Sequence, residues 1–410
     1  MSRELSALDA LRPGDDARVE PGLLGRRLEA LIGVARHGRL VITLPDGARI
    51  EQRGDLPGVE AALAIGNWRT LWRCLFAGSM GFAEGYMAGE WSSPDLVRVL
   101  DWIAANRREL SATSDGTRLA HLMERVTHAL RRNSRRNSRR NIAAHYDLGN
   151  DFYAQWLDAG MNYSSAIHAR PDLPLEAAQA AKIAAAADML ELSAPARILE
   201  IGCGWGAVME HLVRLGHAVT GITLSQEQRA YAERRLGTAA PAGGWDVRLE
   251  DYRDVEGSFD RVVSIEMVEA VGEAYWPVYF RTLHDRLRPG GIAVIQAITI
   301  EAERYDSYRC APDFIQRYIF PGGMLPTRAI LEGQIRAAGL ALGRVLDFGQ
   351  SYALTLEAWR QRFLAAWPRI EPMGFDARFR RMWEFYLAYC EAGFRQGAID
   401  VHLMQFRRPA

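Results

Sequence analysis

The stretch that decides the fold is Arg197-Ile198-Leu199-Glu200-Ile201-Gly202-Cys203-Gly204-Trp205-Gly206. A short apolar run leads into a glycine-rich turn, and a helical pattern to Leu215 follows the turn. In open α/β sheets such a turn lies at the carboxyl end of a strand, where ligands bind. Its glycines let a ligand approach the backbone closely, beside the N-terminus of the next helix. The stretch therefore predicts a ligand-binding loop.

The sequence on either side of this turn continues the same alternation. We predict a helix over residues 175–192 and further strands at 217–222, 260–265 and 291–300. Strands that alternate with helices of this length indicate a parallel, doubly wound sheet. The predicted class is therefore α/β, with a Rossmann-like domain preceded by a smaller N-terminal α+β domain. In that smaller domain, residues 39–50 are typical of a strand, a turn at Pro45-Asp46-Gly47 and a second strand.

The chain has 410 residues, more than one hydrophobic core usually organises. We expect an accessory domain over 1–125, a linker over 126–146 and the main domain over 147–410. The linker carries six arginines and no acid, although the whole chain has no net charge. It is either a solvated hinge or a docking strip for the phosphates of an anionic membrane, because guanidinium groups match phosphate oxygens. No nucleic-acid-binding motif accompanies it, so we expect no nucleic acid partner.

Composition excludes several classes of protein. With 49% hydrophobic and 24% charged residues the chain is globular. Its long apolar runs, such as residues 292–300, are about half of the ~20 residues that cross a bilayer. The first residues lack the basic and apolar regions of a secretion signal. Four widely spaced cysteines argue against a disulfide framework or a zinc site, and we expect no metal.

The glycine-rich turn by itself leaves the cofactor open. The dinucleotide pattern G-x-G-x-x-G fails, because Ala207 stands at the position of its third glycine. The strand over 217–222 also ends without the acid that would hold a ribose. Methyltransferases that use S-adenosylmethionine have similar loops. The spacing of the glycines therefore does not choose between a dinucleotide and S-adenosylmethionine.

Seven blocks of sequence, in the same order along the chain, carry a resemblance that identifies the cofactor. They lie at residues 141–153, 163–166, 201–206, 221–228, 251–254, 318–323 and 363–368. On these blocks the chain resembles the cyclopropane-fatty-acyl-phospholipid synthase family from about Arg39 to Arg408. The resemblance implies a Rossmann-like methyltransferase domain that uses S-adenosylmethionine to modify unsaturated acyl chains of phospholipids. It also implies a cytoplasmic enzyme associated peripherally with the inner face of the membrane, whose N-terminal domain presents the lipid.

The resemblance assigns the cofactor site residue by residue. Carried over, S-adenosylmethionine contacts Tyr163, Ser164, Glu200, Gly202, Gly204, Trp205, Gly206, Thr223, Leu224, Gln228 and Tyr252. An aromatic face such as that of Tyr163 would attract the sulfonium cation. Trp205 has a second reading, as an aromatic residue that only packs.

The resemblance also implies how the reaction ends. Methyl transfer to one carbon of a cis double bond leaves a carbocation, and a bound bicarbonate removes a proton from the new methyl so that a cyclopropane ring closes. The aligned bicarbonate-binding residues are Ser165, Glu269, Gln296, Ile298 through its backbone, and Tyr352. Serine replaces the family's cysteine and glutamine its histidine, although both can still form hydrogen bonds. The nearby Glu266 is read as a cap of the turn.

Two alternatives stay open. The altered base site could release the proton elsewhere and give a methyl- or methylene-branched chain. The protein could also be a catalytically silent lipid-binding homologue. The expected partner is an unsaturated phospholipid in an anionic membrane surface, and a homodimer is possible.

Overall fold

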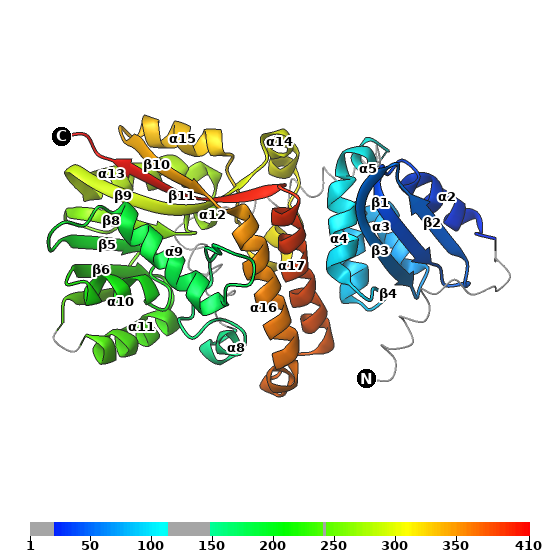
Figure 1. The fold of residues 1–410 in the computed structure, drawn as a ribbon, viewed down its shortest axis with the longest axis horizontal. Helices are drawn as coiled ribbons and strands as arrows, with labels where there is room; N and C mark the ends of the chain where they lie inside the picture. The colour runs from blue at the N-terminus through cyan, green and yellow to red at the C-terminus, as the bar shows by residue number, and fades with distance from the viewer. Residues whose placement is uncertain (1–19, 114–147, 241–242) are drawn as a thin grey trace. The chain divides into compact units, whose positions relative to one another are not determined.

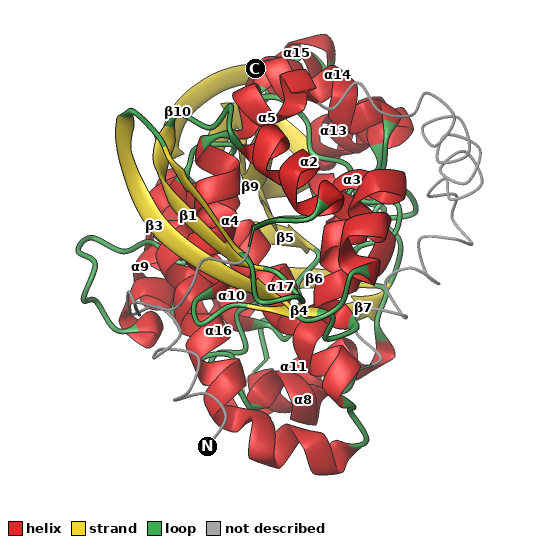
Figure 2. Ribbon diagram, turned by 90° about the vertical axis from the view of Figure 1, so that its right-hand side faces the viewer, coloured by secondary structure: helices red, strands yellow, loops and turns green. Residues whose placement is uncertain are grey.

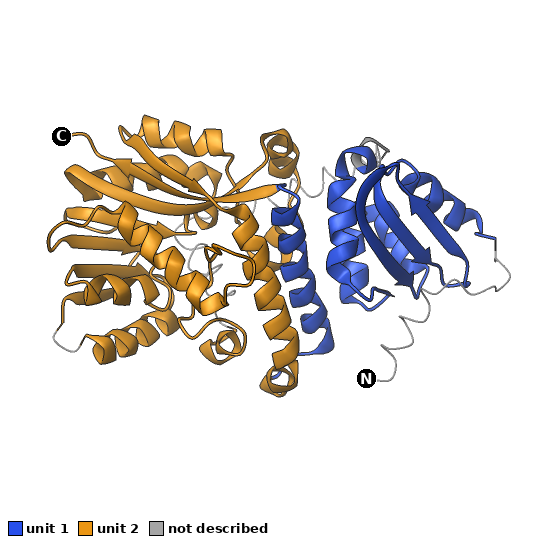
Figure 3. Ribbon diagram, viewed as in Figure 1, with its two compact units in different colours: residues 1–124, 374–398 blue, residues 125–373, 399–410 orange. Residues whose placement is uncertain are grey.

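The structure is a computed structural model that describes residues 20–113, 148–240 and 243–410. The chain divides into two compact units, shown in Figure 3. The first comprises residues 1–124 and 374–398, and the second comprises 125–373 and 399–410. Each unit is therefore assembled from two segments, whereas the predicted ranges 1–125 and 147–410 are continuous. The predicted linker over 126–146 lies outside the described residues.

The first unit contains a mixed four-stranded sheet in the order β2-β1-β3-β4. Strand β1 pairs antiparallel with β2 and parallel with β3, which confirms the predicted strand, turn and strand over 39–50. The strands are β1 (His37–Thr43), β2 (Arg49–Arg53), β3 (Leu56–Ile65) and β4 (Trp91–Ser92). The helices are α2 (Leu23–Ile32), α3 (Arg69–Met87), α4 (Leu96–Ala105), α5 (Arg107–Thr113) and α17 (Ala377–Arg395).

Two polar contacts fix the distant helix α17 within this first unit. The Tyr86 hydroxyl donates a hydrogen bond to Glu384 over 2.9 Å, and Arg395 donates to the buried Asp101 over 2.7 Å. Because buried carboxylates are stable only when paired, the Arg395–Asp101 contact ties α17 firmly to α4.

The second unit contains a seven-stranded sheet in the order β10-β11-β9-β8-β5-β6-β7 (Figures 1 and 2). Neighbouring strands from β9 to β7 are parallel, whereas β11 runs antiparallel to both β9 and β10. The predicted α/β fold is confirmed, and the reversed strand β11 is an addition to it. The strands are β5 (Arg197–Ile201), β6 (Ala218–Thr223), β7 (Trp245–Leu249), β8 (Phe259–Ile265), β9 (Leu287–Ile300), β10 (Ala341–Asp347) and β11 (Ile399–Arg407).

Helices connect these strands, and several begin at a capping side chain. The Ser225 hydroxyl accepts a hydrogen bond from the backbone of Gln228, and Thr327 does the same for Ile330, which satisfies N–H groups that the first helical turn leaves free. The helices are α8 (Asn150–Ala154), α9 (Leu175–Met189), α10 (Ala207–Arg214), α11 (Gln226–Ala239), α12 (Val268–Val271), α13 (Trp276–Arg286), α14 (Ala302–Cys310), α15 (Arg328–Ala337) and α16 (Gly349–Ile370), with short helices at Glu273–Tyr275, Ile315–Ile319 and Glu371–Met373. Among the helices in the described ranges, none has the length and apolar character needed to cross a bilayer.

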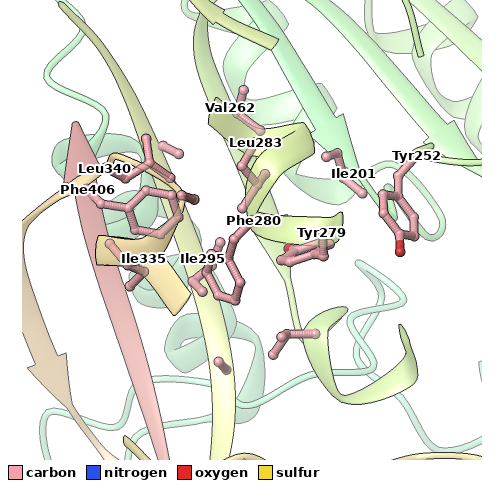
Figure 4. Packing of buried hydrophobic residues seen from close by; sticks show 14 of the residues in the cluster. Ile201, Tyr252, Val262, Tyr279, Phe280, Leu283, Ile295, Ile335, Leu340 and Phe406 are labelled. Carbon is pink, nitrogen blue, oxygen red and sulfur yellow. The ribbon is translucent and has the colours of Figure 1, made fainter. Parts of the chain in front are cut away.

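A buried apolar cluster fixes the central strands of the second unit (Figure 4). Val262 on β8 and Ile295 on β9 pack with Phe280 and Leu283 from α13, and Phe406 joins them from β11. Each such side chain contributes about 1.5–3 kcal/mol through burial. The middle of β8 and most of β9 are apolar, as expected for strands of a parallel sheet that is covered on both faces. This packing holds the carboxyl ends of β5, β8 and β9 in place, where the candidate site lies.

Candidate active site

The glycine-rich loop leaves β5 and returns into α10. Its three glycines, Gly202, Gly204 and Gly206, have φ angles of +80°, +52° and +83°, a region that other residues rarely adopt. The N–H groups of Gly202 and Cys203 both donate to the Ile222 carbonyl over 3.0 Å, which ties the loop to β6. A Cβ on Gly204 would meet nothing within 4 Å, so the backbone is open to a ligand at this glycine.

The second loop, after β6, is held by its own hydrogen bonds. The Thr223 hydroxyl donates to the side chain of Gln228 over 2.8 Å and accepts from the Ser225 N–H over 3.2 Å. Leu224 between them is partly exposed. The predicted residues Thr223, Leu224 and Gln228 therefore lie together at the carboxyl end of β6 and the start of α11.

Tyr163 lies in a group of rings that we call the aromatic cluster: Tyr153, Trp156, Tyr163 and Trp359. The centre of the Tyr163 ring lies 5.3–5.5 Å from the centres of the other three. Trp359 in turn lies 6.1 Å from the ring of Tyr352, so the cluster reaches the predicted base residues. An assembly of π faces of this kind can stabilise a positive charge.

Trp205 has a packing role in the structure. Its indole N–H donates to Asn150 over 2.7 Å, its ring lies 5.3 Å from that of Tyr153, and it is 4% exposed. These contacts anchor α8 against the glycine-rich loop. They do not exclude a ligand at the loop backbone beside it.

Lys182, the chain's one lysine, is fully buried in α9 and was not among the predicted site residues. Its ammonium donates to the Ser164 hydroxyl over 2.8 Å, and Gln179 from the same helix donates to the Ser164 carbonyl over 2.9 Å. Burial lowers the pKa of Lys182, while the charges of Glu266, Asp158 and Glu200 act in the opposite direction. A single lysine among 50 basic residues, within an alanine-rich helix, was the signal that could have revealed it.

Glu200 and Tyr252 are buried near the ends of β5 and β7, and each has an oxygen without a hydrogen-bond partner in the described part of the chain. Burial raises the pKa of Glu200 to about 8, and its Oε2 has no hydrogen-bond partner among the described residues. Burial likewise raises the pKa of Tyr252 to about 12, and within the same residues its hydroxyl has no partner either. Buried polar atoms normally form hydrogen bonds. With the open face of Gly204, these atoms fit a ligand that brings its own donors and acceptors.

Glu266, directly after β8, joins three of the predicted base residues. Its Oε1 accepts hydrogen bonds from the Ser165 N–H over 2.8 Å and from the Gln296 amide over 2.6 Å. Its Oε2 accepts from the Tyr352 hydroxyl over 2.8 Å. Burial raises the pKa of Glu266, whereas these three donors and the charge of Lys182 lower it. The carboxylate, rather than the acid, suits this set of donors.

The prediction that Glu266 serves only as a cap of the turn is therefore wrong. Helix α12 has no side-chain cap, and both oxygens of Glu266 bind residues from distant elements. Its φ of +51° lies in the left-handed region, a conformation that costs an acidic residue about 1–3 kcal/mol. An acid at the carboxyl end of a parallel strand was a signal in the sequence, but its hydrogen bonds come from residues far away along the chain.

Glu269, on α12, has a different environment. One of its oxygens accepts a hydrogen bond from the Ile298 N–H, and its Oε2 has no partner among the described residues. Burial and the nearby charge of Glu266 raise the pKa of Glu269 to about 8. Since Glu266 has three donors and Glu269 has one, we assign the negative charge to Glu266 and a proton to Glu269 at neutral pH.

The predicted base residues are thus brought together, though not in the predicted way. The Ser165 hydroxyl donates to the neighbouring Ala166 carbonyl over 3.0 Å, and Ser165 contacts Glu266 only through its backbone. Gln296, Tyr352 and Ile298 each donate to one of the two carboxylates.

Comparison with known proteins identifies the family to which the chain is similar. The profile of the family described as mycolic acid cyclopropane synthetase matches residues 133–404. The chain is 43% identical to tuberculostearic acid methyltransferase UfaA1 of Mycobacterium tuberculosis, over 79% of this chain and 78% of that protein. It is 35% identical to cyclopropane-fatty-acyl-phospholipid synthase of Escherichia coli strain K12, over 81% and 84% of the two chains.

Solved structures agree with these relatives. The cyclopropane synthase MmaA2 of Mycobacterium tuberculosis has a TM-score of 0.62 and 31% identity, and the match covers 66% of this chain and 98% of that one. Mycolic acid cyclopropane synthase CmaA1, solved with SAH and CTAB, has the same TM-score, 30% identity and the same coverage. The chain therefore belongs to the cyclopropane-fatty-acyl-phospholipid synthase family, whose members are S-adenosylmethionine-dependent methyltransferases acting on lipid acyl chains.

Proposed function

We propose that the protein methylates a carbon of a cis double bond in an unsaturated phospholipid acyl chain, and that a cyclopropane ring closes when the new methyl loses a proton. One observation carries the proposal beyond methyl transfer in general. A buried carboxylate, Glu266, lies beside the aromatic cluster, to which the Tyr352 ring connects it. A base next to cation-stabilising rings suits an alkene substrate, whose methylation produces a carbocation.

The geometry supports the residues that the resemblance assigned to S-adenosylmethionine. Four features lie at the ends of β5, β6 and β7: the open backbone at Gly204, the loop at Thr223, the hydroxyl of Tyr252, and the Glu200 Oε2, which has no hydrogen-bond partner within the described residues. When bound, S-adenosylmethionine supplies an electrophilic methyl group. Tyr163 would face its positive charge, and the neighbouring Ser164 is fixed by hydrogen bonds from Lys182 and Gln179.

A second candidate product is a methylene-branched chain, which a separate hydride donor would have to reduce to give a methyl branch. Two observations favour it: the 43% identity to a relative named as a tuberculostearic acid methyltransferase, and a base site that uses Ser165 and Gln296. After methyl transfer, a hydride shift would place the cation on the methylated carbon. Loss of a proton from the methyl would then leave a methylene branch instead of a ring.

The lipid would be reached at a membrane surface, and the first unit offers a suitable face. Trp72, Leu75 and Phe76 on α3 are 48%, 56% and 65% exposed, and the two rings stack with centres 6.0 Å apart. Their spacing of three and four residues places them on one side of the helix. Aromatic and leucine side chains of this kind insert into the boundary of a bilayer. The arginine-rich segment would add attraction to anionic lipid.

Lipid analysis of a host with and without the expressed protein tests this function. We expect new phospholipid acyl chains heavier by one methylene group, and NMR then separates cyclopropane protons from alkene protons. The inactive control is Gly204→Val, in which the loop is blocked. Unchanged lipids, with folded protein that binds S-adenosylmethionine, would support the silent homologue instead.

A further inference from the structure

We propose that Glu266 is the catalytic base, and that its side-chain carboxylate takes the place that bound bicarbonate was expected to occupy. This inference rests on the proposed methylation of a double bond. Each hydrogen-bond donor that the resemblance assigned to bicarbonate has an acceptor among the described residues.

The donors expected to hold bicarbonate are already engaged. The Gln296 amide and the Tyr352 hydroxyl donate to Glu266, as does the Ser165 N–H. The Ser165 hydroxyl, which was the group expected to contact bicarbonate, donates to the Ala166 carbonyl. The Ile298 N–H donates to Glu269. A bicarbonate ion would have to displace Glu266 or Glu269 from these donors and would then be buried beside the like charge of the Glu266 carboxylate, although the protonated Glu269 could donate one hydrogen bond to it. Because a buried anion needs hydrogen bonds or an opposite charge, the residues present do not fit bicarbonate.

Glu266 itself has what a fixed base requires. A carboxylate has about four lone-pair positions, and the three donors leave one on Oε2, which accepts a hydrogen bond from Tyr352. The buried Lys182 helps to keep the group ionised. The left-handed backbone at Glu266 directs a carboxylate into this position at an energetic cost, as strained residues at functional sites often do.

The chemical step balances without another reactant. Transfer of the methyl group forms a bond between the methyl carbon and one alkene carbon, breaks the bond to sulfur and leaves the other alkene carbon cationic. Glu266 Oε2 then takes a proton from the new methyl. The electron pair of that C–H bond closes the ring, or forms the methylene double bond after a hydride shift. Glu266 is left as a carboxylic acid. A carbocation is so acidic that a hydrogen-bonded carboxylate is a sufficient base.

The first experiment measures the full-length parent protein with S-adenosylmethionine and vesicles of dioleoyl phosphatidylglycerol, in buffer freed of carbon dioxide. We expect the same turnover with and without added sodium bicarbonate. Turnover that falls several-fold on depletion and recovers on addition would overturn the proposal while leaving methyl transfer intact. No methylation of the lipid under either condition would overturn the proposed function itself.

The second experiment compares two variants at the same position. Glu266→Ala opens a space lined by the freed Ser165, Gln296 and Tyr352 donors, so turnover should fall about a hundredfold or more and recover in part with added bicarbonate or formate. Glu266→Gln fills that space with a group that is not a base, so its turnover should fall equally and should not recover. S-adenosylmethionine affinity, measured by calorimetry, should stay within a few-fold of the parent for both. Parent-level turnover in both variants would contradict the assignment.

Discussion

Tyr352 donates its phenolic hydrogen bond to Glu266 over 2.8 Å, although the two residues are 86 positions apart in the chain. The bond joins the start of α16 to the end of β8, and through Trp359 it connects the base site with the aromatic cluster. The proposed base and the aromatic cluster therefore belong to one continuous arrangement. This relationship supports the proposal that the substrate is an alkene.

Cofactor binding should depend on the open backbone at Gly204. In Gly204→Val the side chain would fill the space that is empty within 4 Å of this residue, so we expect affinity for S-adenosylmethionine to fall about tenfold or more by calorimetry. Valine is also strained at positive φ. Gly216→Val is the matched control, because Gly216 has a φ of +90° and equally open surroundings away from the loop. Equal affinity in the two variants would remove the assigned role of Gly204.

The buried lysine should influence the pH dependence of the reaction. The charge of Lys182 lowers the pKa of Glu266, so Lys182→Met should raise that pKa. A base with a raised pKa is ionised only at higher pH, and the acidic limb of kcat/KM should therefore move upward in pH. Lys182→Arg keeps the charge and should retain a limb closer to that of the parent. If Lys182→Met lowers turnover but leaves the acidic limb of the kcat/KM profile at the same pH, the role of Lys182 is purely structural.

Glu269 should make the folded state less stable as the pH rises. Burial raises its pKa to about 8, whereas an unfolded chain loses this proton near pH 4.3. The folded state thus binds the extra proton between these values, and stability decreases through that range by up to about 1.4 kcal/mol per pH unit. The stability of the parent relative to Glu269→Gln, measured by chemical denaturation, should therefore decrease from about pH 5 to pH 8.

The matched control for this slope is Glu176→Gln. The Arg362 side chain lowers the pKa of Glu176. Glu176 is then ionised in both the folded and the unfolded chain above about pH 5, and its contribution to stability should be constant across the same window. Parallel stability curves for the parent and Glu269→Gln would contradict a buried, protonated Glu269.

Membrane association should use the exposed face of α3. Replacing Trp72 and Phe76 together with serine should weaken sedimentation with phosphatidylglycerol vesicles about tenfold or more, because each buried ring contributes about 1.5–3 kcal/mol. Leu215→Ser, at another exposed apolar residue, is the control. Replacing the arginines Arg131, Arg132, Arg135, Arg136, Arg139 and Arg140 with glutamine should weaken binding chiefly at low salt, where charges are little screened. If both variants sediment like the parent, neither segment contacts lipid.

The sequence predicted the fold where its signals were local. The apolar run at residues 197–201, the glycines after it and the turn at Pro45-Asp46-Gly47 each determine structure over a few residues, and the structure has the corresponding elements. The two-segment assembly of the units was not predictable in the same way. It depends on pairs such as Arg395 and Asp101, which are 294 positions apart.

The candidate site was predicted in part for the same reason. Resemblance identified Gln296, Tyr352 and Glu269 as members of one set. It could not show that three donors turn toward Glu266, because that depends on a left-handed backbone and on contacts between distant strands and helices. Lys182 was visible in the sequence as an isolated lysine. Its burial against Ser164 became apparent only with the fold.

The most direct test of the account uses S-adenosylmethionine with a fully deuterated methyl group, the purified full-length protein and vesicles of dioleoyl phosphatidylglycerol. Mass spectrometry of the recovered lipid should show acyl chains that carry two of the three deuterons, because Glu266 removes the third from the new methyl. Lipid without deuterium, from protein that binds S-adenosylmethionine, would contradict methyl transfer to the acyl chain. Retention of all three deuterons would show that the proton leaves the acyl chain itself and would contradict removal from the methyl.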